Sequence, residues 1–351
     1  MSVNGCQQGQ RVPCRPPSWE SSVMGPVDVD EAVRRYAASW PSLGPVAESF
    51  VATVTAILDE AGINYLSVTG RAKAVASFAA KAARERDGER VHTDPLRDIT
   101  DQVGVRVITY VRSDVDAVAE LLADQLTVLD DRDMGRETAR AGRFGYASRH
   151  LLVSLDEGEH TAYEPMRCAS IQLRTVLQHA WAEFEHEIRY KGTVPTEHAS
   201  DLDRRFTLAA GLLELADHEF STIRDTIQAE LGGGETPEAD ERDPRISAQE
   251  LTTFLAGRYA SAGWSRTEHY EWMSGLLLEL GIASLDELSA LVRNVDSAAV
   301  TERMGYRYPA GAVRRLDDDL LASVGEGYLG LHGNAHRVDG LRARLAKLRE
   351  V

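Results

Sequence analysis

The sequence has few cysteines, no long hydrophobic run and no excess of positive charge. Its 351 residues include three cysteines, none in a CxxC pair, and this usage is typical of a reducing compartment such as the cytoplasm. No run of about 18 apolar residues is present, so we expect no membrane span. Residues 1–20 lack the apolar core of a secretory signal. The net charge of −16 argues against broad, sequence-independent binding to nucleic acid.

The chain is long enough for two domains, and its hydrophobic fraction of 43% supplies a sizeable core. Residues 1–27 show no periodicity and are predicted to be a disordered tail, so Met24 is an alternative start of translation. Residues 232–246 combine three glycines with prolines and many charges and are predicted to be a linker. We therefore expect one domain over residues 28–231 and a second over residues 247–351.

The first domain mixes strand and helix patterns. Runs of β-branched and apolar residues predict strands at 103–111, 126–130, 150–155 and 166–174. Helical spacing predicts helices at 28–62 (with a break near Ser42–Pro45), 70–86, 113–125, 175–191 and 199–231, and residues 131–144 are predicted to be a loop. The fold class is therefore α/β (α+β), with a mixed sheet of four to five strands flanked by helices.

The second domain is predicted to be entirely helical. The candidate helices are 247–261, 266–280, 284–293, 296–304, 311–323 and 335–350.

The segment GRAKAVASFAAK (70–81) gathers positive charge in an acidic protein. Lys73, Ser77 and Lys81 follow an i, i+4, i+8 spacing and would form one stripe of a helix, with Arg71 at its start. Such cations suit a polyphosphate. A solvated helix face is the alternative.

The segment DITDQVGVR (98–106) combines a carboxylate with a buried strand. Asp101 lies just before the strand, where it would suit Mg²⁺ beside nucleotide phosphates. Arg106 lies within the apolar run and must be paired or stacked on a flat group. A structural ion pair between Arg106 and an aspartate is the alternative.

In RFGYASRHLLV (143–153), a Gly–Tyr pair leads into a strand. Tyr146 would stack on a base, and Ser148 and His150 would share one strand face, with His150 near phosphate. The alternative is a turn before an ordinary edge strand.

In SIQLRTVLQHAWAEFEHEIRYK (170–191), polar residues alternate along a strand and then recur along a helix. Ser170, Gln172 and Arg174 would share one strand face. His179, Glu183 and His186 would share a helix face at i, i+4, i+7, which suits Zn²⁺ or, alternatively, solvent-facing polar residues.

The order and spacing of these four segments resemble the synthetase domain of the RelA/SpoT family, especially the small alarmone synthetases. The resemblance covers about residues 30–230. It implies transfer of pyrophosphate from ATP to the 3′-hydroxyl of GTP or GDP with Mg²⁺. On the ATP side it implies that Arg71 and Arg106 stack on adenine, that Lys73 and Lys81 hold phosphates, and that Ser77 supports them.

The same resemblance implies roles for the metal and the acceptor. Asp101 would bind Mg²⁺, Tyr146 would stack on guanine and His150 would approach the acceptor phosphates. The acceptor pocket would also be lined by Gln172, Arg174 and His179. The family has a lysine in the loop before Gly145, and here Arg140 and Arg143 are the nearby cations.

One position departs from the family pattern. A glutamate normally stands two residues before the glutamine of the IQxRT strand, and this chain has Ser170 there. That glutamate is credited with holding Mg²⁺ or accepting the hydroxyl proton. Serine keeps an oxygen but loses the negative charge and the basicity. The change predicts a slow synthetase or a nucleotide-binding regulator.

Three further alternatives stay open at this stage. Some relatives pyrophosphorylate the 3′ end of tRNA, so tRNA is an alternative acceptor. The helical domain is an alternative site of regulation. Self-association into a homo-oligomer is the third alternative.

Overall fold

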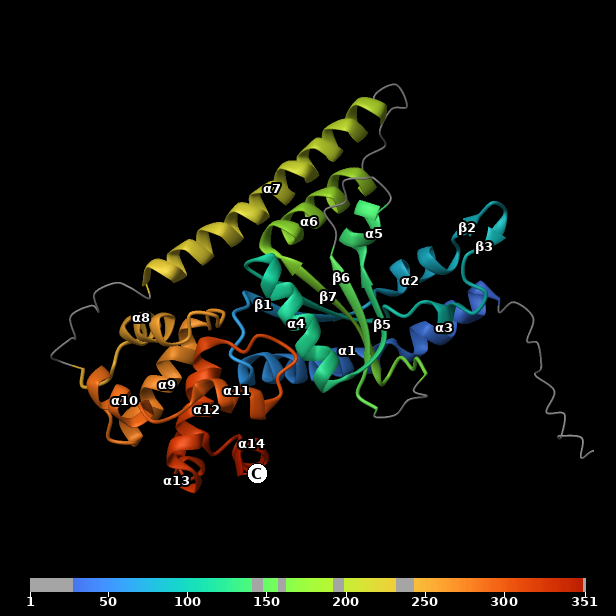
Figure 1. The fold of residues 1–351 in the computed structure, drawn as a ribbon. Helices are drawn as coiled ribbons and strands as arrows, with labels where there is room; N and C mark the ends of the chain where they lie inside the picture. The colour runs from blue at the N-terminus through green and yellow to red at the C-terminus, as the bar shows by residue number, and fades with distance from the viewer. Residues whose placement is uncertain (1–27, 141–147, 157–161, 192–198, 232–242, 350–351) are drawn as a thin grey trace, which may run out of the picture.

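The computed structural model describes residues 28–140, 148–156, 162–191, 199–231 and 243–349 (Figure 1). The predicted tail and most of the predicted linker lie outside these residues. So do Arg143 and Tyr146, two of the predicted acceptor-site residues.

A five-stranded mixed sheet forms the centre of the first part of the chain. The strands lie in the order β1 (Ser67–Ala72), β4 (Val103–Thr109), β7 (Cys168–Thr175), β6 (Arg149–Ser154) and β5 (Thr127–Asp133). β4 and β7 are parallel, and the other neighbours are antiparallel. The predicted fold class is therefore confirmed, although the sequence patterns had indicated only four of the five strands.

The strand that the sequence patterns did not indicate is β1. Residues 70–86 were predicted to form one helix, and this prediction is wrong. Instead of one helix, the chain forms β1, then α2 (Val75–Ala82), then a small hairpin of β2 (Glu85–Arg86) and β3 (Glu89–Arg90). β1 gains backbone pairing with β4 over its whole length. Alanine-rich spacing favours a helix locally, but the ladder with β4 decides the conformation.

Helix α1 (Val29–Glu60) runs without the break predicted near Ser42–Pro45 and contains Pro41 and Pro45. Burial of Leu43 and Ala47, which flank Pro45, continues the apolar stripe through this region. By length and composition alone, α1 is long and apolar enough to cross a membrane, whereas the sequence predicted no membrane span. Its buried side chains pack in the core beneath the sheet.

The two faces of the sheet differ in polarity. On one face, side chains such as Val105, Val107 and Ile171 pack in a core with α1 and α4 (Arg112–Gln125). The opposite face is polar, and α6 (Val176–Lys191) contacts it through Glu183.

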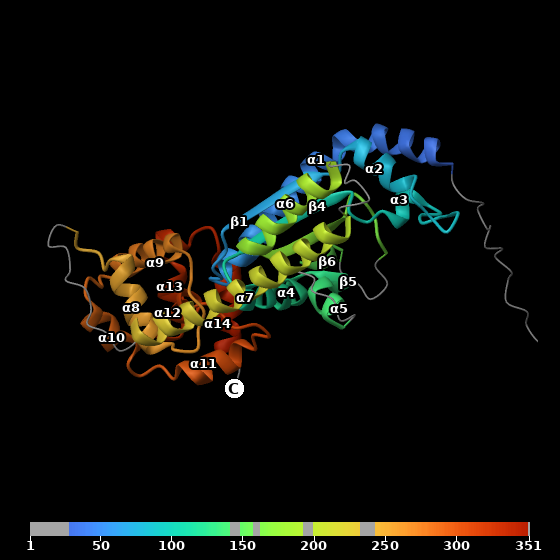
Figure 2. The same cartoon turned by 90° about the horizontal axis from the view of Figure 1, so that it is seen from above.

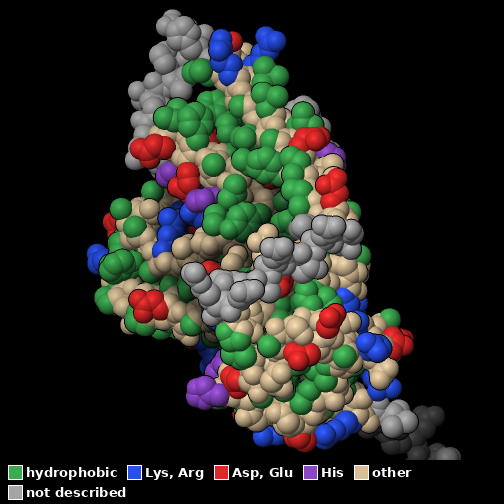
Figure 3. Space-filling view, turned by 90° about the vertical axis from the view of Figure 1, so that its left-hand side faces the viewer, with side chains coloured by type: hydrophobic (Ala, Val, Ile, Leu, Met, Phe, Trp, Pro, Cys, Tyr) green, Lys and Arg blue, Asp and Glu red, His purple; other side chains and the backbone are tan. Residues whose placement is uncertain are grey.

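Helix α7 (Ala199–Leu231) has the predicted bounds and lies along α6 in both views (Figures 1 and 2). Trp181 and Ala210 form a small core between the two helices. Hydrophobic side chains also gather on the exposed surface of this region (Figure 3), including Phe184, Ile188, Leu208, Leu212, Leu215 and Ile223.

Two short helices complete this part of the chain. α3 (Pro95–Asp98) precedes β4, and α5 (Met134–Arg140) follows β5. The predicted loop over 131–144 is therefore wrong for residues 131–140, because β5 continues to Asp133, which pairs with Arg149 of β6.

The C-terminal part has its own hydrophobic core and, within residues 243–349, only helices. These are α8 (Ala248–Arg258), α9 (Thr267–Glu279), α10 (Leu285–Val292), α11 (Ser297–Met304), α12 (Ala312–Val324), α13 (Glu326–Leu329), the 3₁₀ turn η2 (His332–Asn334) and α14 (Val338–Arg349). Capping boxes formed by Ser247 with Glu250 and by Ser284 with Glu287 begin α8 and α10. All six predicted helices are present, and α13 and η2 were missed.

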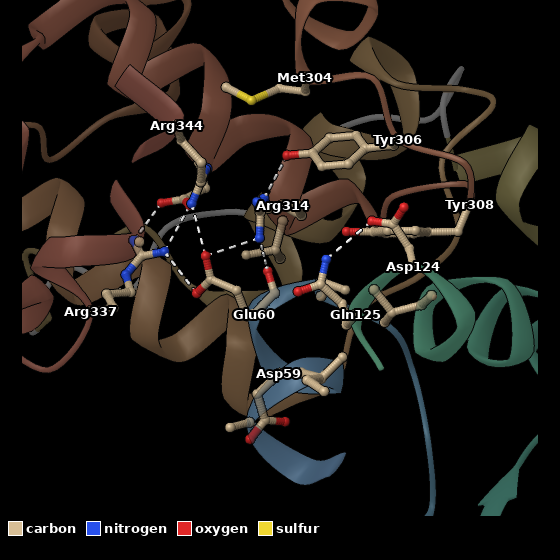
Figure 4. Close-up of a pocket in the computed structure, with 18 of the residues that line it drawn as sticks. Asp59, Glu60, Asp124, Gln125, Met304, Tyr306, Tyr308, Arg314, Arg337 and Arg344 are labelled. Atoms are coloured by element: carbon tan, nitrogen blue, oxygen red, sulfur yellow. Dashed lines mark hydrogen bonds and ion pairs between the residues drawn. The ribbon is translucent and has the colours of Figure 1, made fainter. Parts of the chain in front are cut away.

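The helical unit docks against the end of α1 (Figure 4). Glu60 of α1 contacts three arginines of the helical unit, Arg314 at 3.0 Å, Arg344 at 3.1 Å and Arg337 at 3.6 Å. Backbone also meets backbone here, because Gly311 donates a hydrogen bond to the carbonyl oxygen of Ala61 at 3.3 Å.

Candidate active site

The polar face of the sheet brings most of the predicted residues together. Cross-strand pairing aligns Arg106, Gln172, His150 and Arg132 in one row, and residues paired in this way point to the same face. A second row contains Arg71, Gly104 and Ser170. Arg174 lies two residues beyond Gln172 and therefore also faces this side.

Arg71 reaches this face from a strand, since it belongs to β1. The prediction that Arg71 stands at a helix start is wrong, because residues 70–72 pair with β4 and form a strand. Arg71 pairs with Gly104, two residues before Arg106, so both arginines lie on the polar face, and the charges of both act on Arg174.

Asp101 is the centre of a compact charged cluster beside the first row. Its carboxylate accepts hydrogen bonds from Lys73 Nζ at 2.7 Å and from Lys81 Nζ at 3.1 Å. Burial alone would raise the pKa of Asp101, but the hydrogen bonds and charges of both lysines outweigh burial and lower the pKa below its usual value. Asp101 is therefore ionised at neutral pH.

The predicted helical stripe of Lys73, Ser77 and Lys81 is only partly correct. Lys73 lies before α2, and Ser77 and Lys81 lie on it. Both lysines still converge on Asp101, because the turn between β1 and α2 directs Lys73 back toward the start of β4. Ser77 is exposed, and no hydrogen bond joins it to this cluster within the described part of the chain.

Arg106 is paired, but with an acid that the sequence patterns did not indicate as its partner. Arg106 contacts Glu183 of α6 at 3.0 Å, in place of an aspartate. Glu183 also lies 3.7 Å from Nδ1 of His179. An acid on a helix that follows β7 in sequence can reach β4 only through the tertiary fold, so local spacing contained no signal for this contact.

The remaining cations on this face are crowded. Burial and the positive charges of Arg106 and Arg71 lower the pKa of Arg174 to about 10, although Glu183 opposes this effect. Nε of Arg174 is buried and has no hydrogen-bond partner within the described residues. A cluster with more cations than acids is a favourable place for a polyanion.

His150 is positioned by its neighbour two residues earlier. Ser148 Oγ and His150 Nε2 are 2.7 Å apart, which agrees with the prediction that they share one face. Burial and then the charges of Arg174 and Arg132 lower the pKa of His150. At neutral pH the ring is therefore uncharged, and it can accept or donate a hydrogen bond.

Ser170 lies in the second row, opposite Gly104 of β4 and Leu152 of β6. It is 8% exposed. Asp101, Glu183 and Glu137 contact cations of this face, and they already pair with Lys73, Arg106 and Arg132, respectively. The position that is glutamate in the resembled family therefore contributes only a hydroxyl group.

The arrangement suits a Mg²⁺ ion that takes most of its ligands from a substrate. Mg²⁺ is commonly held by one or two carboxylates together with phosphate and water oxygens. Asp101 provides one ionised carboxylate beside cations that suit phosphate. No group of three or more His, Cys, Asp or Glu residues suited to a metal exists among the described residues, so the Zn²⁺ trio of His179, Glu183 and His186 is not formed there.

A cavity with a volume of about 910 Å³ lies elsewhere, between α1, α4 and the helical unit. None of the predicted site residues lines it. Each carboxylate on its wall already contacts a basic side chain, as Glu60 contacts Arg314. The polar sheet face is therefore a better candidate for the active site than this cavity.

Residues 70–194 match the family model described as a region found in RelA / SpoT proteins. GTP pyrophosphokinase YjbM of Bacillus subtilis (strain 168) is 33% identical over 165 residues, which cover 46% of this chain and 72% of the relative. The chain belongs to the RelA/SpoT family. GTP pyrophosphokinase YwaC of the same organism is 29% identical over 144 residues, which cover 40% of this chain and 66% of that protein.

Solved structures of small alarmone synthetases are also similar to this chain. Small alarmone synthetase 1 from Bacillus subtilis is 26% identical with a TM-score of 0.42, and the alignment covers 57% of this chain and 99% of that one. Its complex with the product pppGpp is 25% identical with a TM-score of 0.43 and covers 57% and 100%.

Proposed function

We propose that this chain is a (p)ppGpp synthetase that transfers pyrophosphate from ATP to the 3′-hydroxyl of GTP or GDP. The observation that supports it most is the cluster of Lys73, Lys81 and Asp101 beside the guanidinium-rich sheet face, in a chain of the RelA/SpoT family. Relatives of this chain carry the name GTP pyrophosphokinase, and the enzyme is pyrophosphokinase-like. Its proposed place of action is the cytoplasm, where these nucleotides occur.

ATP would bind at the edge of the sheet formed by β1 and β4. The flat guanidinium groups of Arg71 and Arg106 would contact adenine, and Lys73 and Lys81 would hold the phosphates. Phosphate oxygens would then replace Asp101 as partners of the lysines. The released carboxylate would hold Mg²⁺, which supplies neutralisation of phosphate charge.

The acceptor would bind farther along the same face. His150, Gln172, Arg174 and His179 lie on this side, and Tyr146 and Arg143 are proposed to complete the pocket. The 3′-oxygen of the acceptor forms a bond to the β-phosphorus of ATP, the bond between that phosphorus and the α–β bridging oxygen breaks, and AMP leaves. The hydroxyl proton must pass to a base or to water.

Phosphoryl transfer depends mainly on positioning and on charge stabilisation. The described cations can position the phosphates and stabilise their charge, whereas Ser170 provides no basic group to accept the proton of the 3′-hydroxyl. We therefore expect a low turnover. This same observation supports a second candidate function, a nucleotide-binding regulator that has lost catalysis.

Incubation of the purified chain with ATP, MgCl₂ and GTP or GDP tests the proposal. Chromatography of the products should show pppGpp or ppGpp together with AMP, and chelation of the metal with EDTA should abolish them. Asp101→Ala should lower the rate by at least about 10³-fold, since it removes the carboxylate proposed to hold the metal. Asp98→Ala is the matched control, because Asp98 bonds to Thr93 and the amide of Asp94, outside the cluster.

The other outcomes identify the alternatives. If label from ATP enters tRNA and does not enter a free nucleotide, the proposed acceptor is contradicted and tRNA is supported as the acceptor. Tight nucleotide binding without any product would contradict the synthetase and support the regulator.

A further inference from the structure

We propose that Tyr36 and Trp40, both on α1, are positioning residues that hold Lys73 in place for its work on ATP. This inference rests on the role proposed above for Lys73. Neither residue belongs to the motifs that resemble the RelA/SpoT family.

The backbone of Lys73 is held from two directions. Its carbonyl oxygen accepts a hydrogen bond from Tyr36 Oη at 2.6 Å and another from Trp40 Nε1 at 3.0 Å. Its amide donates to the carbonyl oxygen of Gln102 at 2.8 Å. Lys73 lies in the short turn between β1 and α2, where no helix or strand ladder provides these partners.

Tyr36 is itself rigidly placed. Its side chain is fully buried, and its ring stacks on Phe78 with a centroid distance of 4.0 Å and an interplanar angle of 10°. Phe78 belongs to α2, the helix that also carries Lys81. One tyrosine therefore fixes the carbonyl of Lys73 with its hydroxyl group and the helix of Lys81 with its ring.

Trp40 is 42% exposed. Burial of the indole therefore does not explain why a tryptophan stands at this position. Its N–H group would otherwise bond to water, and here it bonds to the backbone of the turn. Two donors on one carbonyl restrict rotation of the peptide group that follows Lys73. This restriction maintains the direction of the lysine side chain, whose Nζ lies 2.7 Å from Asp101.

Three variants test the inference, namely Tyr36→Phe, Trp40→Phe and the double variant. Each removes a donor and keeps an aromatic ring. Tyr259→Phe is the matched control, because Tyr259 is 1% exposed and its hydroxyl group donates to Asp319 at 2.6 Å in the helical unit. Tyr36→Phe and Tyr259→Phe therefore each remove a buried tyrosine hydroxyl group, at different places, and Tyr259 also accepts a hydrogen bond from Arg258 at 3.3 Å.

We expect the KM for ATP to rise about fivefold in each single variant, which corresponds to the loss of one hydrogen bond of typical net strength. The rise should be larger in the double variant. The KM for GTP should stay within about twofold of the wild type in all of them. A merely structural loss would lower the amount of active enzyme, and so kcat, without a selective change in the KM for ATP.

Hydrogen–deuterium exchange of the peptide that contains Lys73 and α2 provides a readout that needs no turnover. Exchange should be faster in Tyr36→Phe and Trp40→Phe than in wild type, and unchanged in Tyr259→Phe. If the wild type makes no alarmone, the proposed function fails, and this exchange pattern alone decides whether the positioning contact exists.

The inference is overturned if exchange at this peptide is the same in Tyr36→Phe and Tyr259→Phe. It is also overturned if an active wild type and both single variants share one KM for ATP. Should Tyr36→Phe fail to fold, Trp40→Phe, which alters a half-exposed side chain, decides the matter by the same measurements.

Discussion

Ser170 is the residue whose chemistry most affects the proposed activity. It lies on the polar face in the row of Arg71 and Gly104, so a longer side chain there would point toward the cations that are proposed to bind ATP. Gly104 has no side chain, and a Cβ atom placed on it would have no neighbour closer than 3.9 Å. The sheet therefore leaves room beside Ser170 for the missing carboxylate.

Replacing Ser170 with glutamate should raise the rate of (p)ppGpp synthesis by about 10²-fold, because general-base catalysis typically contributes about 10²–10⁴-fold. The measurement is the initial rate at saturating ATP and GTP. Ser170→Gln has the same length but no charge, and it should show no gain. If the wild type is already active and Ser170→Glu has the same rate, the reaction needs no carboxylate at position 170.

At the scale of elements, the contact between α1 and β1 shapes the ATP side of the site. A Cβ atom on Gly70 would lie 2.6 Å from Val51 Cγ2 and 3.0 Å from the carbonyl oxygen of Ala47, both on α1. Only glycine lets the strand approach the helix this closely. The approach in turn brings the turn at Lys73 within reach of Tyr36.

Gly70→Ala should lower the free energy of unfolding by about 1–3 kcal/mol, the usual cost of overpacking a tight contact. Urea denaturation followed by circular dichroism measures it. Gly104→Ala, in the paired strand, is the control and should be neutral or slightly stabilising, since its nearest neighbour would be 3.9 Å away. Equal losses in both variants would show that the approach of β1 to α1 is not the cause.

At the scale of the whole molecule, two hydrophobic cores meet at one buried charge network. Glu60 is the only acid that the first unit contributes to the cluster of Arg314, Arg337 and Arg344 within the described residues, and the three arginines are 6–9% exposed. The helical unit adds Asp317 and Asp318, which are almost completely buried. Figure 4 shows the three guanidinium groups directed toward Glu60.

Glu60→Gln should destabilise the folded chain by about 2 kcal/mol. It removes one negative charge from three buried cations, and the partial exposure of Glu60 reduces the penalty below that of a fully buried pair. Thermal and urea denaturation give the value. Glu31→Gln, which alters an exposed ion pair at the other end of α1, should change it by less than about 0.5 kcal/mol. A Glu60→Gln variant as stable as Glu31→Gln would contradict a stabilising role for this network.

Several elements could be predicted from the sequence because their patterns are local and strong. The β-branched run 103–111 and the helical spacing of 199–231 predicted β4 and α7, and the alternation of Ser170, Gln172 and Arg174 indicated one strand face. The motif order was also sufficient to indicate the RelA/SpoT family. These properties depend on residues close together in the chain, where periodicity records which side faces the core.

Only the tertiary structure decided which groups meet. Residues 70–72 became strand because β4 offered a ladder, and α1 continued through two prolines because its apolar stripe had a core to cover. Asp101 acquired lysine partners 28 and 20 residues away, and Arg106 acquired Glu183. Charge pairs and hydrogen bonds between distant segments depend on the complete fold, so local composition and spacing contain no record of them.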